Sequence, residues 1–176
     1  MRRILSSILL LALMLFSWVL CAQNLNGRIY WSGDTDLGWK DFKGKPKNNH
    51  PFDAETNWAV EYSCALNGDT LRFTLKCYFD MNGSWVKKGK GTEVLLNHER
   101  NHFDLGEVYA RKMRKALLEY AYHRITIDKD VQTIYDKMFS ECQSVQKQYD
   151  KETDHSKNQA KQDKWDTKII SLLKKL

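Results

Sequence analysis

The stretch from Trp58 to Phe79, WAVEYSCALNGDTLRFTLKCYF, decides the fold of the N-terminal half of the chain. Apolar residues occupy every second position on both sides of a central Asn67-Gly68-Asp69-Thr70 segment. A period of two is typical of half-buried strands, and Asn, Gly and Asp tolerate the positive φ angles of a tight turn. The sequence therefore predicts an antiparallel hairpin of two strands, Trp58–Leu66 and Leu71–Phe79.

On either side of this hairpin the pattern changes. Residues 24–51 are rich in Gly, Asn, Asp and Lys, which predicts irregular loops with a short strand near Arg28–Trp31. Downstream, apolar residues recur at helical spacing. We expect one helix from the capping residue Thr92 to about His123, a second from Asp128 or Asp130, and a third from about Asn158. Strands followed by helices indicate an α+β fold, with an N-terminal antiparallel hairpin or small sheet and three helices after it.

The first residues are typical of a targeting segment. Arg2 and Arg3 precede an apolar run from Ile4 to Leu20, and Ala22 is small enough to precede a cleavage site. We expect residues 1–22 to be a signal peptide, the alternative being an uncleaved anchor, and this segment to be the only contact with a membrane. Residues 23–176 then form a single exported domain, periplasmic or extracellular.

The charge is mildly basic. Lys and Arg number 28 against 22 Asp and Glu, and they are spread along the predicted helices. This distribution is typical of a solvated surface and does not favour a nucleic-acid partner. It does not indicate an oligomeric state.

The part of the chain after residue 22 has three cysteines, Cys64, Cys77 and Cys142. Cys64 and Cys77 have the same parity on the two predicted strands, so we expect small buried side chains there, and a disulfide is the alternative.

One motif carries chemistry: His98-Glu99-Arg100-Asn101-His102 matches HExxH, within the first predicted helix. Residues four apart lie on one face of a helix, so His98 and His102 can bind one Zn²⁺ ion. Glu99 is then placed as the general base that takes a proton from the attacking water. These residues predict a zinc-dependent hydrolase.

A catalytic zinc usually has three protein ligands, and the third is open between two candidates. His155 lies in a polar break between the second and third helices, which a loop can bring to the metal. Glu107 is closer in sequence, but on an unbroken helix it points away from His102 and is placed to pair with Arg111. Tyr149 is a candidate for stabilising an oxyanion, with core packing as its alternative. His50 and His123 are expected at the surface.

Four separated segments together resemble a known family. They are Trp39-Lys40-Asp41-Phe42-Lys43-Gly44-Lys45-Pro46, Ser84-Trp85-Val86, His98 to Leu105 with Glu107, Ala110 and Arg111, and Tyr149-Asp150 with Thr153 and His155. The chain resembles a bacterial family of unknown function commonly described as predicted secreted zinc-dependent proteases. The resemblance implies a zincin-like metallopeptidase that acts on peptides or proteins, and it supports His155 as a functional position. Ser156 departs from the glycine expected there.

Other functions are compatible with the same residues. The chain has six Trp, and Trp31, Trp39, Trp58 and Trp85 would suit the groove of a non-catalytic exported binding protein. A metal-dependent amidase of cell-wall peptides would share the zinc site and differ only in substrate.

Overall fold

The computed structural model describes residues 27–46, 49–67, 70–121 and 125–176. The predicted signal segment therefore lies outside the described residues, as does His123. Within the described part of the chain, no helix is long and apolar enough to cross a membrane.

The predicted hairpin is confirmed. Strands β3 (Trp58–Asn67) and β4 (Thr70–Asp80) pair antiparallel over their whole length, from Trp58 opposite Phe79 to Asn67 opposite Thr70. The short strand β1 (Arg28–Tyr30) adds to the other edge of β4, which gives a sheet of order β1-β4-β3. A separate two-stranded sheet pairs β2 (Ala54–Glu55) with β5 (Trp85–Val86). A 3-10 turn, η2, covers Trp39–Asp41.

Three helices follow the strands, so the α+β class is confirmed. They are α2 (Glu93–Leu118), α3 (Ile127–Thr153) and α4 (Gln159–Lys175). The predicted Thr92 cap is present, since its side chain accepts a hydrogen bond from the Leu95 amide, and Asn158, near which the third helix was expected to begin, likewise accepts one from the Lys161 amide. Each side chain satisfies one of the amides that a helix N-terminus leaves without a partner.

The helix α2 ends five residues before the predicted limit near His123. Leu118 is 76% exposed, and Glu119 is exposed as well. Here the apolar surface that supports the rest of α2 ends, and helical stability in proteins comes mainly from such packing.

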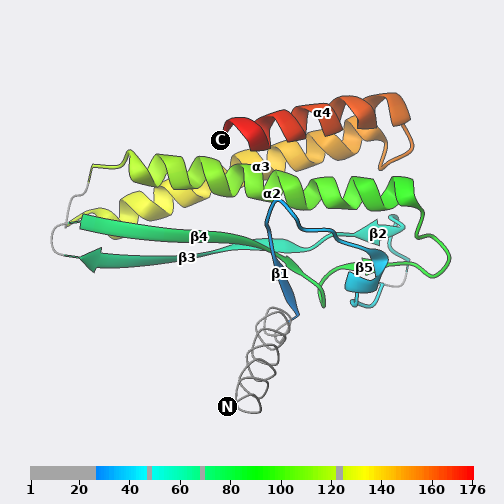
Figure 1. Cartoon of the computed structure of the whole chain (residues 1–176), viewed down its shortest axis with the longest axis horizontal. Coiled ribbons are helices and arrows are strands. Elements are labelled where there is room, and N and C mark those ends of the chain that lie inside the picture. The colour runs from blue at the N-terminus through cyan, green and yellow to red at the C-terminus, as the bar shows by residue number, and fades with distance from the viewer. Residues whose placement is uncertain (1–26, 47–48, 68–69, 122–124) are drawn as a thin grey trace, which may run out of the picture.

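The core surrounds α2, which contacts the sheet, α3 and α4 (Figure 1). Phe103 and Ala110 pack with Cys77 and Phe79 of the sheet. On other sides of the helix, Leu105 packs in one cluster with Tyr149, Trp165 and Ile169, and Val108 and Tyr109 pack with Cys142. The helix α2, which carries the HExxH motif, is therefore the central element of the fold.

The expectation for the cysteines was partly wrong. Cys77 is buried but Cys64 is exposed, and both are free, as is the buried Cys142. The period-two pattern assigns Cys64 to a face of the sheet but does not say that anything covers that face. Cys77 lies opposite Val60, four residues from Cys64, so the two cysteines are about 13 Å apart along the sheet. That separation is too large for a disulfide.

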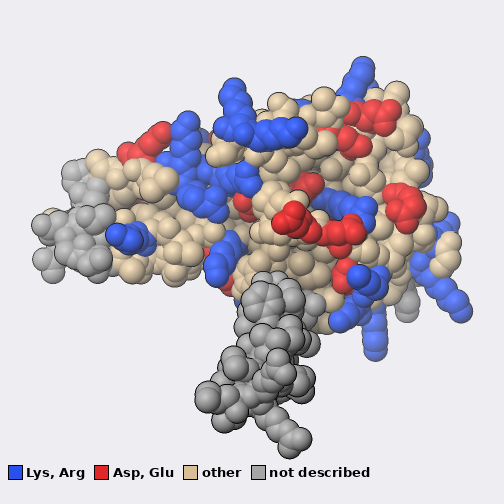
Figure 2. Space-filling view, viewed as in Figure 1, with Lys and Arg blue, Asp and Glu red and all other residues tan. Residues whose placement is uncertain are grey.

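The visible surface carries both signs of charge. Figure 2 shows Lys and Arg side chains next to Asp and Glu over the helices, so the positive excess is not gathered into a single patch on this face.

Candidate metal centre

The two histidines of the HExxH motif meet on one face of α2. Their Nε2 atoms lie 3.2 Å apart, and the rings are nearly perpendicular, at 88°. The side chain of His98 is 2% exposed and that of His102 14% exposed. The helical spacing therefore produces the geometry that the sequence predicted for this pair.

A third group comes from α3, and the sequence analysis missed it as a ligand. The Oδ1 atom of Asp150 lies 2.9 Å from Nε2 of His102 and 3.2 Å from Nε2 of His98. Asp150 stands on the last turn of α3, three residues before the helix ends at Thr153. The packing of α3 along α2 brings this carboxylate to the histidines.

The carboxylate of Asp150 and the imidazole of His102 shift each other's ionisation. Burial opposes ionisation of Asp150, but hydrogen bonds with His102 and His98 outweigh it and hold the pKa of this carboxyl below its usual range. Burial likewise opposes the charged form of His102, whereas the Asp150 hydrogen bond and the nearby charge of Glu99 raise the pKa of His102 to about 9. The cluster therefore favours a bound positive charge.

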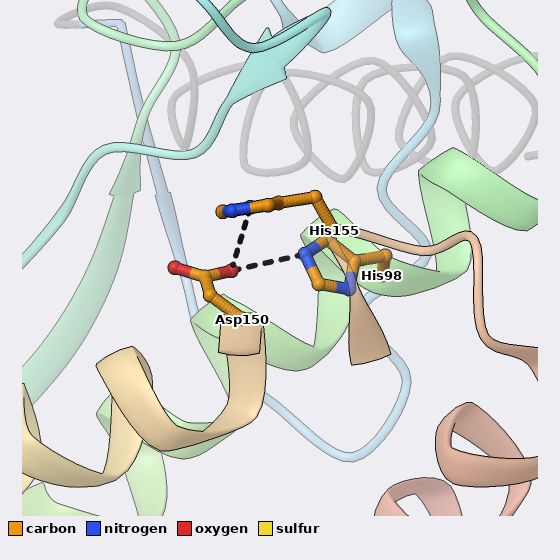
Figure 3. Close-up of side chains that lie close together, drawn as sticks. All are labelled: His98, Asp150 and His155. Carbon is orange, nitrogen blue, oxygen red and sulfur yellow. Dashed lines mark hydrogen bonds and ion pairs between the residues drawn. The ribbon is translucent and has the colours of Figure 1, made fainter. Parts of the chain in front are cut away.

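His155 reaches the same place from the loop after α3. Its Nδ1 atom lies 3.5 Å from Oδ1 of Asp150, and Figure 3 shows this carboxylate between His98 and His155. One ligand atom from each of these three residues falls within 4.8 Å of the others. The loop turns back sharply because Asp154, His155 and Ser156 all have positive φ angles, of 47°, 49° and 76°. The ring of Phe52 lies against His155 at 4.3 Å.

These distances suit a small cation. Four nitrogen or oxygen donors about 2.0–2.1 Å from a tetrahedral Zn²⁺ ion lie about 3.3 Å from one another. The contacts among His98, His102 and Asp150 span 2.9–3.2 Å. Imidazole and carboxylate are both common zinc ligands, so the donor set fits the metal as well.

Two glutamines orient the histidines. Gln162 of α4 places its Oε1 atom 3.2 Å from Nδ1 of His98, and Gln146 of α3 places its Oε1 atom against Nδ1 of His102. Their amide nitrogens donate elsewhere, that of Gln162 to the Tyr149 hydroxyl and that of Gln146 to the His102 carbonyl. The carbonyl of each glutamine therefore accepts a hydrogen from Nδ1, so that in the neutral form of each imidazole the lone pair is on Nε2.

The convergence that results is the main electrostatic feature of the site. When both imidazoles are neutral, two Nε2 lone pairs and one carboxylate oxygen point at the same small volume. A cation in that volume would relieve the repulsion among these three donor atoms.

Glu99 lies beside this cluster. It is 4% exposed, and its Oε2 atom has no hydrogen-bond partner among the described residues. A buried carboxylate oxygen is seldom left without a partner, so one without a partner indicates that a water or a substrate group belongs there. Glu99 lines the same cleft as the histidines.

Tyr149 does not face the cleft. It is fully buried, its hydroxyl donates to the His98 carbonyl at 3.2 Å, and its ring stacks on the His98 imidazole at 4.5 Å. Burial raises the pKa of this phenol far above its usual value. The arrangement favours the packing alternative, in which Tyr149 fixes the position of His98.

Glu107 and His50, two other residues considered in the sequence analysis, do not lie where a ligand of this cluster would lie. Glu107 accepts a hydrogen bond from Nε of Arg111 at 2.9 Å, the pairing expected one helical turn away. His50 was expected at the surface, but its side chain is only 22% exposed, since it packs against Trp85 and lies 3.7 Å from a Glu55 oxygen. The β2–β5 sheet folds over this loop, and the local sequence gave no sign of that.

The centre opens into a large cleft of about 1050 Å³. Its walls are α2, α3, the 50–58 segment that includes β2, and the loop at 155–157. Of the four tryptophans considered for an aromatic groove, Trp58 lines this cleft. Trp85 is buried, and Trp31 and Trp39 pack against the core.

The fold and site define a small α+β protein with a His-His-Asp cluster in a cleft. The chain belongs to a bacterial protein family of unknown function, DUF922, whose match covers residues 34–156. The matched segment includes His98, Glu99, His102, Asp150 and His155, and it ends before α4, which supplies Gln162. No curated protein and no solved structure matches the chain.

Proposed function

We propose that this protein is an exported zinc-dependent hydrolase, most simply a zincin-like peptidase. The observation that carries the proposal is the convergence of Nε2 of His98, Nε2 of His102 and Oδ1 of Asp150 within 3.2 Å. A carboxylate oxygen without a partner, on Glu99, lines the same cleft. The resemblance of the motif segments to predicted secreted proteases supports the same reaction class.

In this proposal each residue has one task. His98, His102 and Asp150 hold the zinc ion, which when bound would polarise a carbonyl group and acidify water. Glu99 takes the proton from the attacking water, because its Oε2 atom is not engaged by the protein. The cleft around it is large enough to admit a stretch of polypeptide.

Asp150 suits the third ligand position better than His155 does. Its Oδ1 atom contacts both Nε2 atoms, whereas Nδ1 of His155 contacts the carboxylate alone, at 3.5 Å. Catalytic zinc sites have three protein ligands and an open fourth position. With Asp150 as third ligand, His155 borders that open position.

A second candidate function follows from the 3.5 Å distance between Nδ1 of His155 and Oδ1 of Asp150. If His155 also binds the ion, four protein donors close the site, as in structural zinc centres. The protein would then be a non-catalytic exported protein that binds zinc for stability.

Metal analysis distinguishes these candidates. We expect one zinc per chain in the wild type, loss of zinc in His98→Ala and Asp150→Asn, and retention in His155→Ala. Glu107→Gln is the matched control, a buried carboxylate of α2 outside the cluster, and should keep its zinc.

Turnover tests the reaction itself. Zinc-loaded wild type should cleave a mixed peptide library, and Glu99→Gln should keep its zinc and lose at least about 100-fold in kcat, the usual contribution of a general base. If both proteins bind zinc but the wild type cleaves neither peptides nor cell-wall peptide amides, the proposed hydrolase function is refuted. Loss of zinc in His155→Ala would instead support the closed site.

A further inference from the structure

A second cavity lies along α2 from the candidate metal centre. It has a volume of about 270 Å³ and is lined by β3, α2 and α3. Its walls are almost entirely apolar and include Val60, Ala110, Met113 and Met138. Ligand sites for whole small molecules usually have volumes of 300–1,000 Å³. This cavity therefore suits a single large side chain better than an entire ligand.

The cavity adjoins the large cleft. Trp58 and Phe139 line both of them. On α2, His102 faces the cleft, whereas Gly106 and Ala110, four and eight residues later, line the cavity. A helix rises 1.5 Å per residue, so these positions lie about 6 Å and 12 Å along α2 from His102.

Gly106 makes room for the wall between the two spaces. A Cβ atom at Gly106 would lie 2.7 Å from the Trp58 ring, a distance that real side chains do not tolerate. The absence of a side chain thus lets the indole lie directly against α2, where it borders both the cleft and the cavity.

The rim of the cavity exposes aromatic rings to solvent. Phe139 is 44% exposed, and Tyr135 stacks on it with an interplanar angle of 9°. Beyond Tyr135, the ring of Tyr62 is 48% exposed. Exposed rings beside an apolar cavity favour an apolar occupant, because contact with it removes both surfaces from water.

We propose that this cavity is a substrate subsite that receives a large apolar side chain, such as Phe, Leu or Met, of a polypeptide. The inference rests on the proposed peptidase function and adds the class of substrate. An extended chain advances about 3.3 Å per residue, so a distance of 6–12 Å from His102 places the apolar residue roughly two to four residues from the cleaved bond. Phe139 and Trp58 are then specificity-determining residues.

The test uses the zinc-loaded full chain and matched peptides that carry Phe, Leu or Ala at each of the four positions on either side of the cleaved bond. We expect kcat/KM to be at least about 10-fold higher for Phe or Leu than for Ala at one position, because even one methylene group in an apolar pocket changes this ratio by about 10-fold to 200-fold. Met138→Trp, which fills the cavity, and Phe139→Ala, which removes its rim, should each reduce that preference to a few-fold.

Phe52→Ala is the control. Phe52 is also an exposed phenylalanine of the large cleft, at 38%, but it does not line the second cavity. Its loss can slow the cleavage of every peptide, but the ratio between Phe and Ala peptides should stay at the wild-type value. If Met138→Trp fails to fold, Phe139→Ala still decides the result, because Phe139 is 44% exposed and lies outside the buried core.

A binding measurement separates this proposal from the peptidase function. Fluorescein-labelled Phe and Ala peptides are titrated with Glu99→Gln and followed by anisotropy, with and without Phe139→Ala. Tighter binding of the Phe peptide that depends on Phe139 supports the subsite whether or not turnover occurs. If the wild type cleaves Phe and Ala peptides at equal rates and binding of the two peptides is equal, the subsite proposal is wrong but the peptidase function stands. Absence of cleavage of any peptide overturns the peptidase function instead.

Discussion

Replacing Gln162 with Leu should weaken zinc binding although Gln162 never touches the metal. Its Oε1 atom accepts from Nδ1 of His98 at 3.2 Å, and its amide nitrogen donates to Tyr149 and to Asp166 at 2.7 Å and 2.8 Å. The side chain is fully buried, so no water replaces these contacts. Leucine has nearly the same volume but accepts and donates nothing, so it removes the orientation of His98 without opening a cavity.

The expected size follows from the role of such partners. Loss of a hydrogen-bond acceptor behind a metal-bound histidine lowers metal affinity by about 10-fold to 100-fold, which is about 1.4–2.7 kcal/mol. The metal-free protein should also lose stability, by about 1–3 kcal/mol, because the Tyr149 hydroxyl and Asp166 lose a buried partner. The two effects are separable, since affinity is measured far below the unfolding transition.

The assay is a competition titration of zinc against a chromophoric chelator, with the unfolding midpoint in urea recorded for each protein. Gln159→Leu is the matched control, because Gln159 is an exposed glutamine of α4 that bonds only Asp163 among the contacts described. Zinc affinity in Gln162→Leu within about twofold of the wild type, in a folded protein, would show that Gln162 does not position His98.

Two further predictions concern local structure. Ser156→Gly should stabilise the fold by up to about 1 kcal/mol, because Ser156 has a φ angle of 76° that glycine adopts without strain. The urea midpoint of unfolding measures this change in stability. Ser140→Gly, on the exposed face of α3, should lower that midpoint instead, because glycine destabilises a helix. In native protein, a thiol reagent should modify Cys64 at once, whereas Cys77 and Cys142 should react only after unfolding, since both are buried and burial raises the pKa of Cys142 to about 12. Cys64→Ser should abolish one rapidly reacting thiol, and an unchanged fast phase in that variant would contradict the assignment.

The elements of the fold were predictable because their signals are local. The alternation over β3 and β4 and the turn between them lie within one continuous stretch, and the caps Thr92 and Asn158 act on amides three residues away. Positions that depend on what covers an element were not predictable in the same way. Cys64 illustrates this, since its strand pairs as expected while its side chain is exposed.

In the candidate metal centre, too, the residues that are close in sequence were predictable and the residue brought in by packing was not. His98 and His102 are four residues apart on one helix, so sequence places them together. Asp150 is 52 residues from His98, and only the packing of α3 against α2 brings their side chains into contact. The Tyr149-Asp150 pair lies in a segment that the family resemblance singled out. Asp150 also lies at the end of a predicted helix, before a polar loop, and this position could have marked its carboxylate as a candidate ligand.

The orienting residues show why the site requires all three helices. The imidazoles come from α2, the carboxylate and Gln146 from α3, and Gln162 from α4. A fold of this size gains little from burying a carboxylate between two imidazoles, because desolvation opposes the charge of the carboxylate. Three consecutive residues with positive φ at 154–156 add local strain at the same place. Buried polar groups and strain concentrated at one point of the fold are expected where binding an ion offsets them, so the folding free energy of this protein and its affinity for zinc should be coupled.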